Sequence, residues 1–97
     1  MSLSTKDKKT LKRIAHDMKP VVYIGQKGIT ESLIAAAQKA LTDHELVKMK
    51  FVDYKESKKA MSEEIVKLTE AELVALIGNT VIVYKKQDDP EKRIIKL

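Results

Sequence analysis

The chain has 97 residues, of which 43% are apolar and 34% are charged, enough for one compact domain with a core and a charged surface. Its longest apolar run is five residues, against the roughly 20 that a membrane-spanning helix needs, which excludes a transmembrane protein. Lysines interrupt every apolar stretch near the N-terminus and cysteine is absent, so we expect a cytoplasmic protein without a signal peptide, a disulfide or a thiolate metal site.

The N-terminal third predicts a helix, a strand and the start of a second helix. Apolar residues recur at the spacing of one helical face through residues 4–18, and Pro20 ends this helix because the residue before a proline avoids the helical conformation. Residues 21–24 are all apolar, which is typical of a strand covered on both faces. After the segment from Gly25 to Gly28, a second helix is expected to begin near Thr30, a good capping residue.

The middle of the chain predicts a second strand and a third helix. Residues 46–52 alternate apolar side chains with Lys48 and Lys50, so we expect a strand with one buried face and one basic face in water. A turn over residues 53–57 then leads to a helix, which the apolar spacing of residues 60–68 indicates. Strand and helix therefore continue to alternate.

The C-terminal third predicts a helical turn and two strands. Residues 69–72 have a capping-box pattern, so we expect a short helical turn over residues 69–76, which Gly78 ends. The β-branched residues 80–85 predict a strand, and residues 93–97 predict a closing strand. The short link between these two strands favours an antiparallel hairpin.

The predicted order is therefore helix, strand, helix, strand, helix, strand, strand, in a single domain over residues 1–97. The two strand-helix-strand units should place their strands in parallel through right-handed crossovers. We expect an α/β fold with a four-stranded mixed sheet packed against helices that lie mainly on one of its faces.

The positive charge is concentrated at one end of the sequence. Residues 1–28 contain seven basic and two acidic residues and so carry the whole net charge of +5, while the rest of the chain contains twelve of each. A surface of one sign attracts polyanions such as RNA, DNA or an anionic membrane. A solvated helix face without any partner is an equally good interpretation of composition alone.

Catalytic residues are scarce. The two histidines, His16 and His44, lack the spacing of a metal site, and no His-Cys pair is available. The sequence contains no nucleophile elbow, Walker loop or dinucleotide-binding fingerprint. We therefore expect a protein that is not an enzyme and that uses no metal or cofactor.

Gly25, Gln26, Lys27 and Gly28 form the first candidate binding element, between the first strand and the second helix. Glycines permit a tight turn and let a ligand approach the main chain, because no Cβ atom intervenes. Exposed loop amides, the helix N-terminus behind them and the charge of Lys27 would favour a phosphate group. The alternative is a plain strand-to-helix turn that needs glycine only for its geometry.

The first helix is the second candidate. Its basic residues share the side opposite the apolar face on a helical wheel; they are Lys9, Lys12, Arg13, His16 and Lys19, with Lys6 and Lys8 beside them. These charges repel one another, and a phosphate backbone would relieve the repulsion. We expect this helix face and the glycine loop to converge on one stretch of sugar-phosphate backbone.

The few aromatic residues limit the kind of nucleic-acid binding. Trp is absent, and Tyr23 and Phe51 fall on predicted strands, where we expect them in the core. The sequence thus indicates no stacking surface for single-stranded bases. It favours recognition of backbone and shape, which is salt-sensitive and weakly sequence-selective.

Several blocks of the sequence occur together in one order. They are Arg13-Ile14-Ala15-His16, Lys19-Pro20-Val21, Gly25-Gln26-Lys27-Gly28-Ile29, and the segment from Leu73 to Tyr84. With these blocks the chain resembles the stand-alone bacterial CRM-domain proteins of the YhbY type, from about residue 4 to residue 97.

The resemblance implies an RNA-binding domain related in fold to the C-terminal domain of a bacterial translation initiation factor, and an association with precursors of the large ribosomal subunit. In plant organelle proteins the same domain serves group II intron splicing. The family's RNA surface is the glycine loop with basic residues of the first helix. In this chain these are Gly25, Gln26, Lys27, Gly28, Arg13, His16 and Lys19, to which the helical wheel adds Lys9 and Lys12.

Our hypothesis is a monomeric, non-catalytic protein that binds structured RNA, namely precursor large-subunit ribosomal RNA in pre-ribosomal particles, without contact to a membrane. Two alternatives remain open. A nucleoid-type DNA-binding protein would use the same basic helix. A protein-interaction module would use an exposed apolar patch, such as the sheet face that carries Ile82 and Tyr84.

Overall fold

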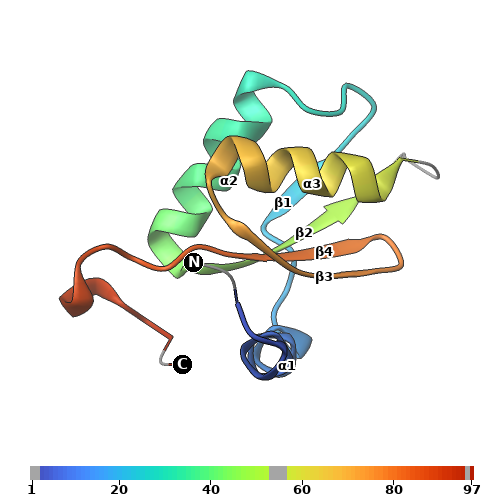
Figure 1. Cartoon of the computed structure of the whole chain (residues 1–97). Coiled ribbons are helices and arrows are strands. Elements are labelled where there is room, and N and C mark those ends of the chain that lie inside the picture. The colour runs from blue at the N-terminus through green and yellow to red at the C-terminus, as the bar shows by residue number, and fades with distance from the viewer. Residues whose placement is uncertain (1–2, 53–56, 96) are drawn as a thin grey trace.

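The computed structural model of the chain describes residues 3–52, 57–95 and 97 (Figure 1). Its elements are α1 (Thr5–His16), β1 (Val22–Ile24), α2 (Glu31–His44), β2 (Leu46–Phe51), α3 (Lys58–Thr69), β3 (Glu72–Ile77), β4 (Thr80–Tyr84) and the 3-10 helix η1 (Pro90–Lys92). The predicted order of three helices and four strands is confirmed, although two elements lie at other residues than expected. The predicted turn over residues 53–57 falls mostly outside the described residues.

The four strands form one mixed sheet in the order β1-β2-β4-β3. β1 and β2 are parallel, as predicted for strands joined through a helix. β4 is antiparallel to both of its neighbours, β2 and β3, so the expectation that the strand at residues 80–85 runs parallel to β2 is wrong. The reason is that the chain enters β4 through a hairpin rather than a crossover. β1 and β3 are the edge strands of the sheet.

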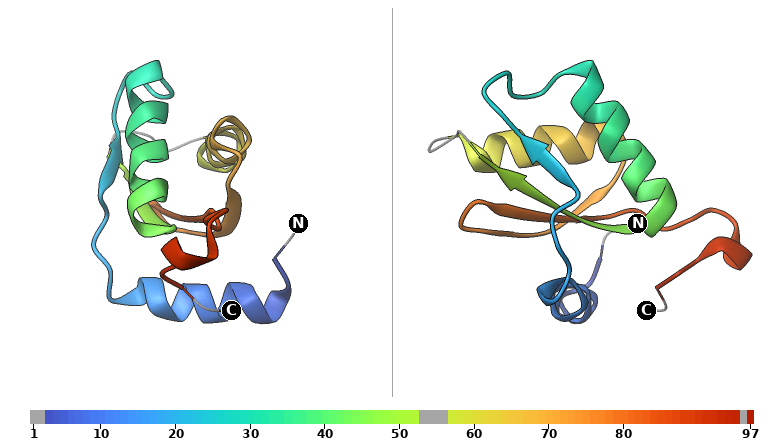
Figure 2. Two further views of the ribbon diagram at one scale, coloured as in Figure 1. Left: turned by 90° about the vertical axis from the view of Figure 1, so that its left-hand side faces the viewer. Right: turned by 180° about the vertical axis from the view of Figure 1, so that it is seen from behind.

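Helices cover both faces of the sheet, as Figures 1 and 2 show. α2 and α3 pack over one face, and α1 crosses the other. The prediction of helices mainly on one face is therefore confirmed for α2 and α3, whereas α1 lies on the other face. Its apolar stripe, centred on the buried residues Leu11 and Ala15, requires a sheet surface of its own. None of the described helices is long and apolar enough to cross a membrane.

The sheet face beneath α1 is closed to a protein partner. Ile82 and Tyr84 of β4 are each only 3% exposed, because they pack against Leu11 and Ala15. The apolar patch that the protein-interaction alternative placed at these two residues is therefore buried in the core.

The predicted helical turn over residues 69–76 is wrong, since this segment contains β3. The capping-box pattern marks the end of α3 instead, where Glu70 adopts a left-handed conformation with φ 57°. β3 follows at once and turns into β4 through Gly78 and Asn79. Gly78 has a φ of 59°, which a two-residue hairpin favours at its first position.

The predicted closing strand over residues 93–97 is also wrong, because its described residues form no strand. The amides of Ile94 and Ile95 instead donate to Oε1 of Glu45, at 2.6 and 2.9 Å, and the amide of Gln87 donates to Oε2 at 2.7 Å. Glu45 is fully buried, between α2 and β2. One carboxylate therefore satisfies backbone groups of the C-terminal segment that a strand partner would otherwise satisfy.

β1 is covered on one face only, which corrects the prediction of a strand buried on both. Val22 and Ile24 point into the core beneath α2 and α3, whereas Tyr23 is 57% exposed on the opposite face. Phe51 of β2 is buried as predicted, but the expectation that Tyr23 is a core residue is wrong. An edge strand is shielded less than a central one, and α1 does not extend over Tyr23.

Candidate nucleic-acid interface

α1 presents its basic residues to solvent because its apolar stripe fixes its rotation. Ser4 caps the helix, since its Oγ accepts a hydrogen bond from the amide of Asp7 at 3.0 Å. Leu11 and Ala15 then hold one side of the helix on the sheet. The basic residues that the sequence assigned to the opposite side are all exposed: Lys6, Lys8, Lys9, Lys12, Arg13, His16 and, three residues beyond the helix, Lys19.

Four of these side chains lie around one shallow hollow. Its volume is about 400 Å³, and Lys9, Lys12, Arg13, His16 and Asp17 line it. Within the described chain the one ion pair joins Lys39 to Asp43 on α2, so none of the bases of α1 is neutralised in this way. The hollow therefore combines three full positive charges with one carboxylate.

One lysine of the predicted basic strand face is used inside the protein. Nζ of Lys48 donates to the main-chain oxygens of Ala15 and Met18, both at 3.2 Å. An ammonium group at the C-terminal end of a helix interacts favourably with the helix dipole. The expectation that Lys48 faces water is therefore wrong, and Lys48 instead ties the end of α1 to β2.

The glycine loop follows β1 directly, as predicted, and its two glycines have different roles. The amide of Gly28 donates to the carbonyl oxygen of Gly25 at 3.0 Å, and Gly28 has a φ of 66°. Gly28 is therefore required by the turn itself. Gly25 has no positive φ, and a Cβ atom added to it would meet nothing within 4 Å, so the fold does not require glycine at this position.

The remaining loop residues, Gln26 and Lys27, are exposed, and the loop leads into the N-terminus of α2. Thr30 caps that helix by accepting a hydrogen bond from the amide of Leu33 at 3.0 Å. The predicted sequence of strand, glycine loop and capped helix is thus confirmed. The expected set of available loop amides is reduced, because the amide of Gly28 is bonded within the turn.

α1 and the glycine loop lie at opposite ends of β1 (Figures 1 and 2). If they converge on one stretch of sugar-phosphate backbone, as expected, that stretch must be as long as β1. Gly25 follows Lys19 at the sixth position along the chain, a span of at most roughly 20 Å for extended chain. A ligand that touches both elements must extend along the β1 edge of the sheet.

The site predicted from the sequence does not include two residues on that edge, although the exposure of Lys50 was predicted. Tyr23 is exposed, and Lys50 of β2 lies beside it in the parallel register and is exposed as well. Residues 21–24 carry no polar residue that could have revealed which face is open. The position of β1 at the edge of the sheet, which single-sequence patterns do not specify, decides the exposure of Tyr23.

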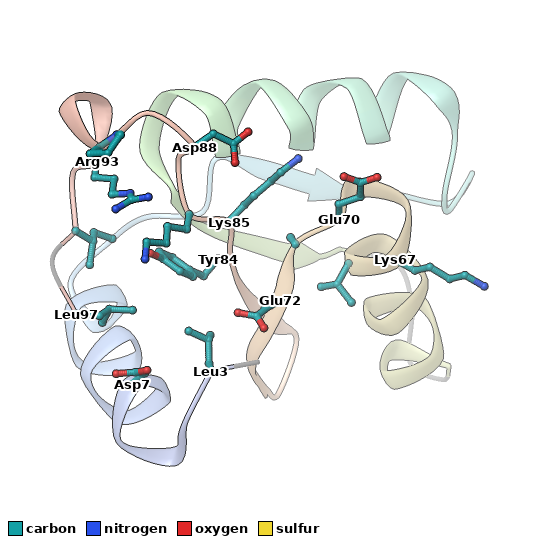
Figure 3. Close-up of a pocket in the computed structure, with 15 residues that line it drawn as sticks. Leu3, Asp7, Lys67, Glu70, Glu72, Tyr84, Lys85, Asp88, Arg93 and Leu97 are labelled. Carbon is teal, nitrogen blue, oxygen red and sulfur yellow. The ribbon is translucent and has the colours of Figure 1, made fainter. Parts of the chain in front are cut away.

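A second, larger cavity lies at the β3 edge (Figure 3). Its volume is about 990 Å³, and its lining includes four acidic residues and four basic ones. They are Asp7, Glu70, Glu72, Asp88, Lys67, Lys85, Lys86 and Arg93. This cavity therefore has no excess of either charge.

Two groups near the C-terminal segment, Glu45 and Tyr84, have shifted pKa values. Burial alone would raise the pKa of Glu45, but hydrogen bonds from three backbone amides and the charge of Arg93 lower it overall. Burial, followed by the charge of Glu45, raises the pKa of Tyr84. No cluster of three possible metal ligands occurs among the described residues, and His16 and His44 lie on different helices.

Comparison with known proteins identifies the family. Residues 3–85 match the CRS1 / YhbY (CRM) domain. The chain is 35% identical over 95 residues to Probable RNA-binding protein PA4753 of Pseudomonas aeruginosa, with 97% of this chain and 91% of that protein covered. It is 38% identical over 89 residues to a Haemophilus influenzae protein named RNA-binding protein, with 91% and 90% covered.

The fold has a counterpart in a solved structure as well. The solution structure of the hypothetical protein SAV1595 from Staphylococcus aureus matches with a TM-score of 0.81 at 28% identity, over 97% of this chain and 99% of that one. The α/β fold with its four-stranded mixed sheet is therefore shared with that protein. By sequence and fold, the chain belongs to the CRS1/YhbY (CRM) domain family.

Proposed function

We propose that the protein is a non-catalytic RNA-binding protein that holds RNA backbone against α1. One observation carries the proposal: the exposed bases of α1 gather around a common hollow and form no ion pair within the described part of the chain. Phosphate groups would supply the missing negative charge. The names of the relatives from Pseudomonas aeruginosa and Haemophilus influenzae support RNA as the polyanion.

The glycine loop serves as a second contact in this proposal. Lys27 brings a positive charge to the exposed tip of the loop, and Gly25 leaves room for a close approach of the RNA backbone. Because α1 and the loop are separated by the length of β1, an RNA that contacts both must span several nucleotides. A folded RNA element meets this requirement better than a dinucleotide.

The binding test compares a hairpin RNA with a DNA duplex of equal length and charge. We expect tighter binding to the hairpin, and a linear fall of log K with log salt concentration with a slope of about −3 to −5 if four to six phosphates are contacted. Tighter binding to the DNA would support a nucleoid-type protein instead. Binding that does not change with salt would contradict the basic surface as the binding element.

The cellular RNA, in this proposal, is precursor ribosomal RNA of the large subunit, within assembling particles. The support is the resemblance to the YhbY type and the membership of the CRM family. Crosslinking in cells, followed by sequencing of the attached RNA, tests this assignment. We expect the crosslinked fragments to map mainly to the large-subunit ribosomal RNA, and fragments spread over messenger RNA would contradict it.

A further inference from the structure

A row of side chains crosses the α1 side of the sheet without being covered by α1. The strand register places Tyr23 beside Lys50, Lys50 beside Thr80, and Thr80 beside Ile77. Their neighbours along the strands, such as Ile24 and Phe51, point to the opposite face, into the core under α2 and α3. The four residues therefore share one face, which we call the open row.

The open row is accessible over much of its length. Tyr23 is 57% exposed and Ile77 is 50% exposed, while Lys50 is exposed and Thr80 is half-buried. The next row, which contains Lys48 and Ile82, is already covered by α1. α1 therefore covers the row with Lys48 and Ile82 but not the open row, where the ring of Tyr23 lies beside Lys50.

The open row lies between the two basic elements of the candidate interface. Lys48, which donates to the carbonyl oxygens of Ala15 and Met18, and Lys50 are on the same side of β2, about 7 Å apart along the strand. At the other end, Tyr23 precedes Gly25 by two residues. An RNA strand that extends from α1 to the tip of the glycine loop therefore passes over Tyr23.

We infer that Tyr23 stacks on an unpaired base of the bound RNA while Lys50 contacts an adjacent phosphate. The inference rests on the proposed function and adds a kind of contact to it. Every nucleobase has a face that can stack on an aromatic ring, so such a site selects for unpaired nucleotides and not for one sequence. The members of the open row include a cation and no acid, which complements RNA.

The test uses two RNAs of equal charge, a stem-loop with an unpaired loop and a blunt, fully paired duplex. Tyr23→Ala should weaken binding of the stem-loop by about 5- to 150-fold and change binding of the duplex by less than about twofold. Tyr23→Phe should retain the wild-type affinities because the ring is kept. Ile94→Ala, which truncates an exposed side chain in the C-terminal segment, is the control and should change neither affinity.

A spectroscopic measurement keeps the test independent of the stability of Tyr23→Ala. The chain contains no Trp, so Tyr23→Trp introduces a single fluorophore at the site. We expect its emission to be quenched by the stem-loop and to change little with the duplex. Lys50→Ala should reduce the salt slope by about one for the stem-loop.

The outcomes separate this inference from the proposed function. A wild-type protein that binds neither RNA would overturn both. Wild-type binding that Tyr23→Ala leaves unchanged would overturn only the stacking site and would suit a protein partner on the open row. An equal loss for both RNAs would overturn stacking too, because it would show that Tyr23 contacts backbone.

Discussion

The hollow on α1 and the cavity at the β3 edge differ both in volume and in the balance of charge among the residues that line them. The cavity is the larger, about 990 Å³ against about 400 Å³, but its four acidic side chains balance its four basic ones. The hollow has Lys9, Lys12 and Arg13 against a single acid, Asp17. A surface with an excess of one charge attracts a polyanion more strongly than a larger surface whose charges balance, so the hollow and not the cavity is the surface that we propose for RNA.

The charged groups near the β3 edge and the C-terminal segment mainly serve the fold. Nζ of Lys85 donates to the carbonyl oxygen of Thr69 at 3.0 Å, and Nε of Arg93 donates to that of Gln87 at 2.9 Å. Glu45 binds three backbone amides. On α1 no comparable use of the basic side chains is found within the described residues. We therefore expect substitutions of the basic residues of α1 to change RNA binding, and substitutions of the charged residues that bind backbone groups to change stability.

The largest expected effect is on binding, in the double variant Lys12→Glu with Arg13→Glu. Reversing two charges in the hollow should weaken RNA binding by about 2–3 kcal/mol, roughly 30- to 150-fold, because two phosphate contacts become repulsive. The melting temperature should stay nearly unchanged, since both side chains are exposed. Titration of a labelled hairpin RNA and thermal unfolding by circular dichroism measure the two quantities.

The matched control reverses two exposed lysines at the other cavity, Lys67→Glu with Lys86→Glu. The change in net charge is the same, but the location is the β3 edge, where Figure 3 shows Lys67 among the lining residues. We expect a loss of RNA affinity of less than about threefold, from the overall charge alone. Equal losses in the two double variants would mean that net charge, and not the surface of α1, determines binding.

The next largest effect is on stability, and it tests the role of Glu45 in holding the C-terminal segment. Glu45→Gln should lower the free energy of unfolding by about 2 kcal/mol, because an amide NH₂ group would face a backbone N–H that the carboxylate now accepts. RNA affinity should stay unchanged under conditions in which the variant is folded. Urea denaturation and RNA titration of the same preparation check both.

The contribution of Glu45 should also depend on pH. The hydrogen bonds and Arg93 lower the pKa of its carboxylate below its ordinary value of 4.5. The stabilisation is therefore fully present above about pH 4.5 and is lost as the pH falls through the lower pKa of the folded state. The stability difference between wild type and Glu45→Gln should accordingly shrink in acid, and a difference that stays constant down to pH 3 would contradict the role of the charge.

Much of the fold was predictable because local patterns agreed with it. The apolar spacing in the three helices and the strand-loop-helix order around Gly25 identified α1, β1, α2, β2 and α3 at nearly their observed residues. β3 was not predicted because the capping-box pattern at residues 69–72 is typical of the start of a helix, whereas in the structure these residues lie at the end of α3. The binding of Ile94 and Ile95 to Glu45 joins distant residues and has no local signal.

The candidate site was predictable only as far as single elements determine it. The exposed face of α1 follows from its helical period and is found as expected. The use of Lys48 and the exposure of Tyr23 depend on where α1 crosses the sheet and on which strand is at the edge, and these are tertiary properties. The separation of α1 from the glycine loop is likewise a tertiary property, which patterns within single elements do not specify.

The smallest expected effects distinguish the two glycines of the loop. Gly28→Ala should destabilise the protein by about 1 kcal/mol, because an L-residue is strained at a φ of 66°. Gly25→Ala should change stability by less than about 0.5 kcal/mol, since its Cβ has open space and an ordinary φ. If RNA backbone approaches the loop, however, that Cβ lies in its way, and the affinity for hairpin RNA should fall several-fold. Thermal unfolding and RNA titration of the two variants measure these effects. A Gly25→Ala protein with wild-type affinity would remove the loop from the proposed interface, leave α1 as the phosphate-binding element, and show that the glycines serve the turn alone.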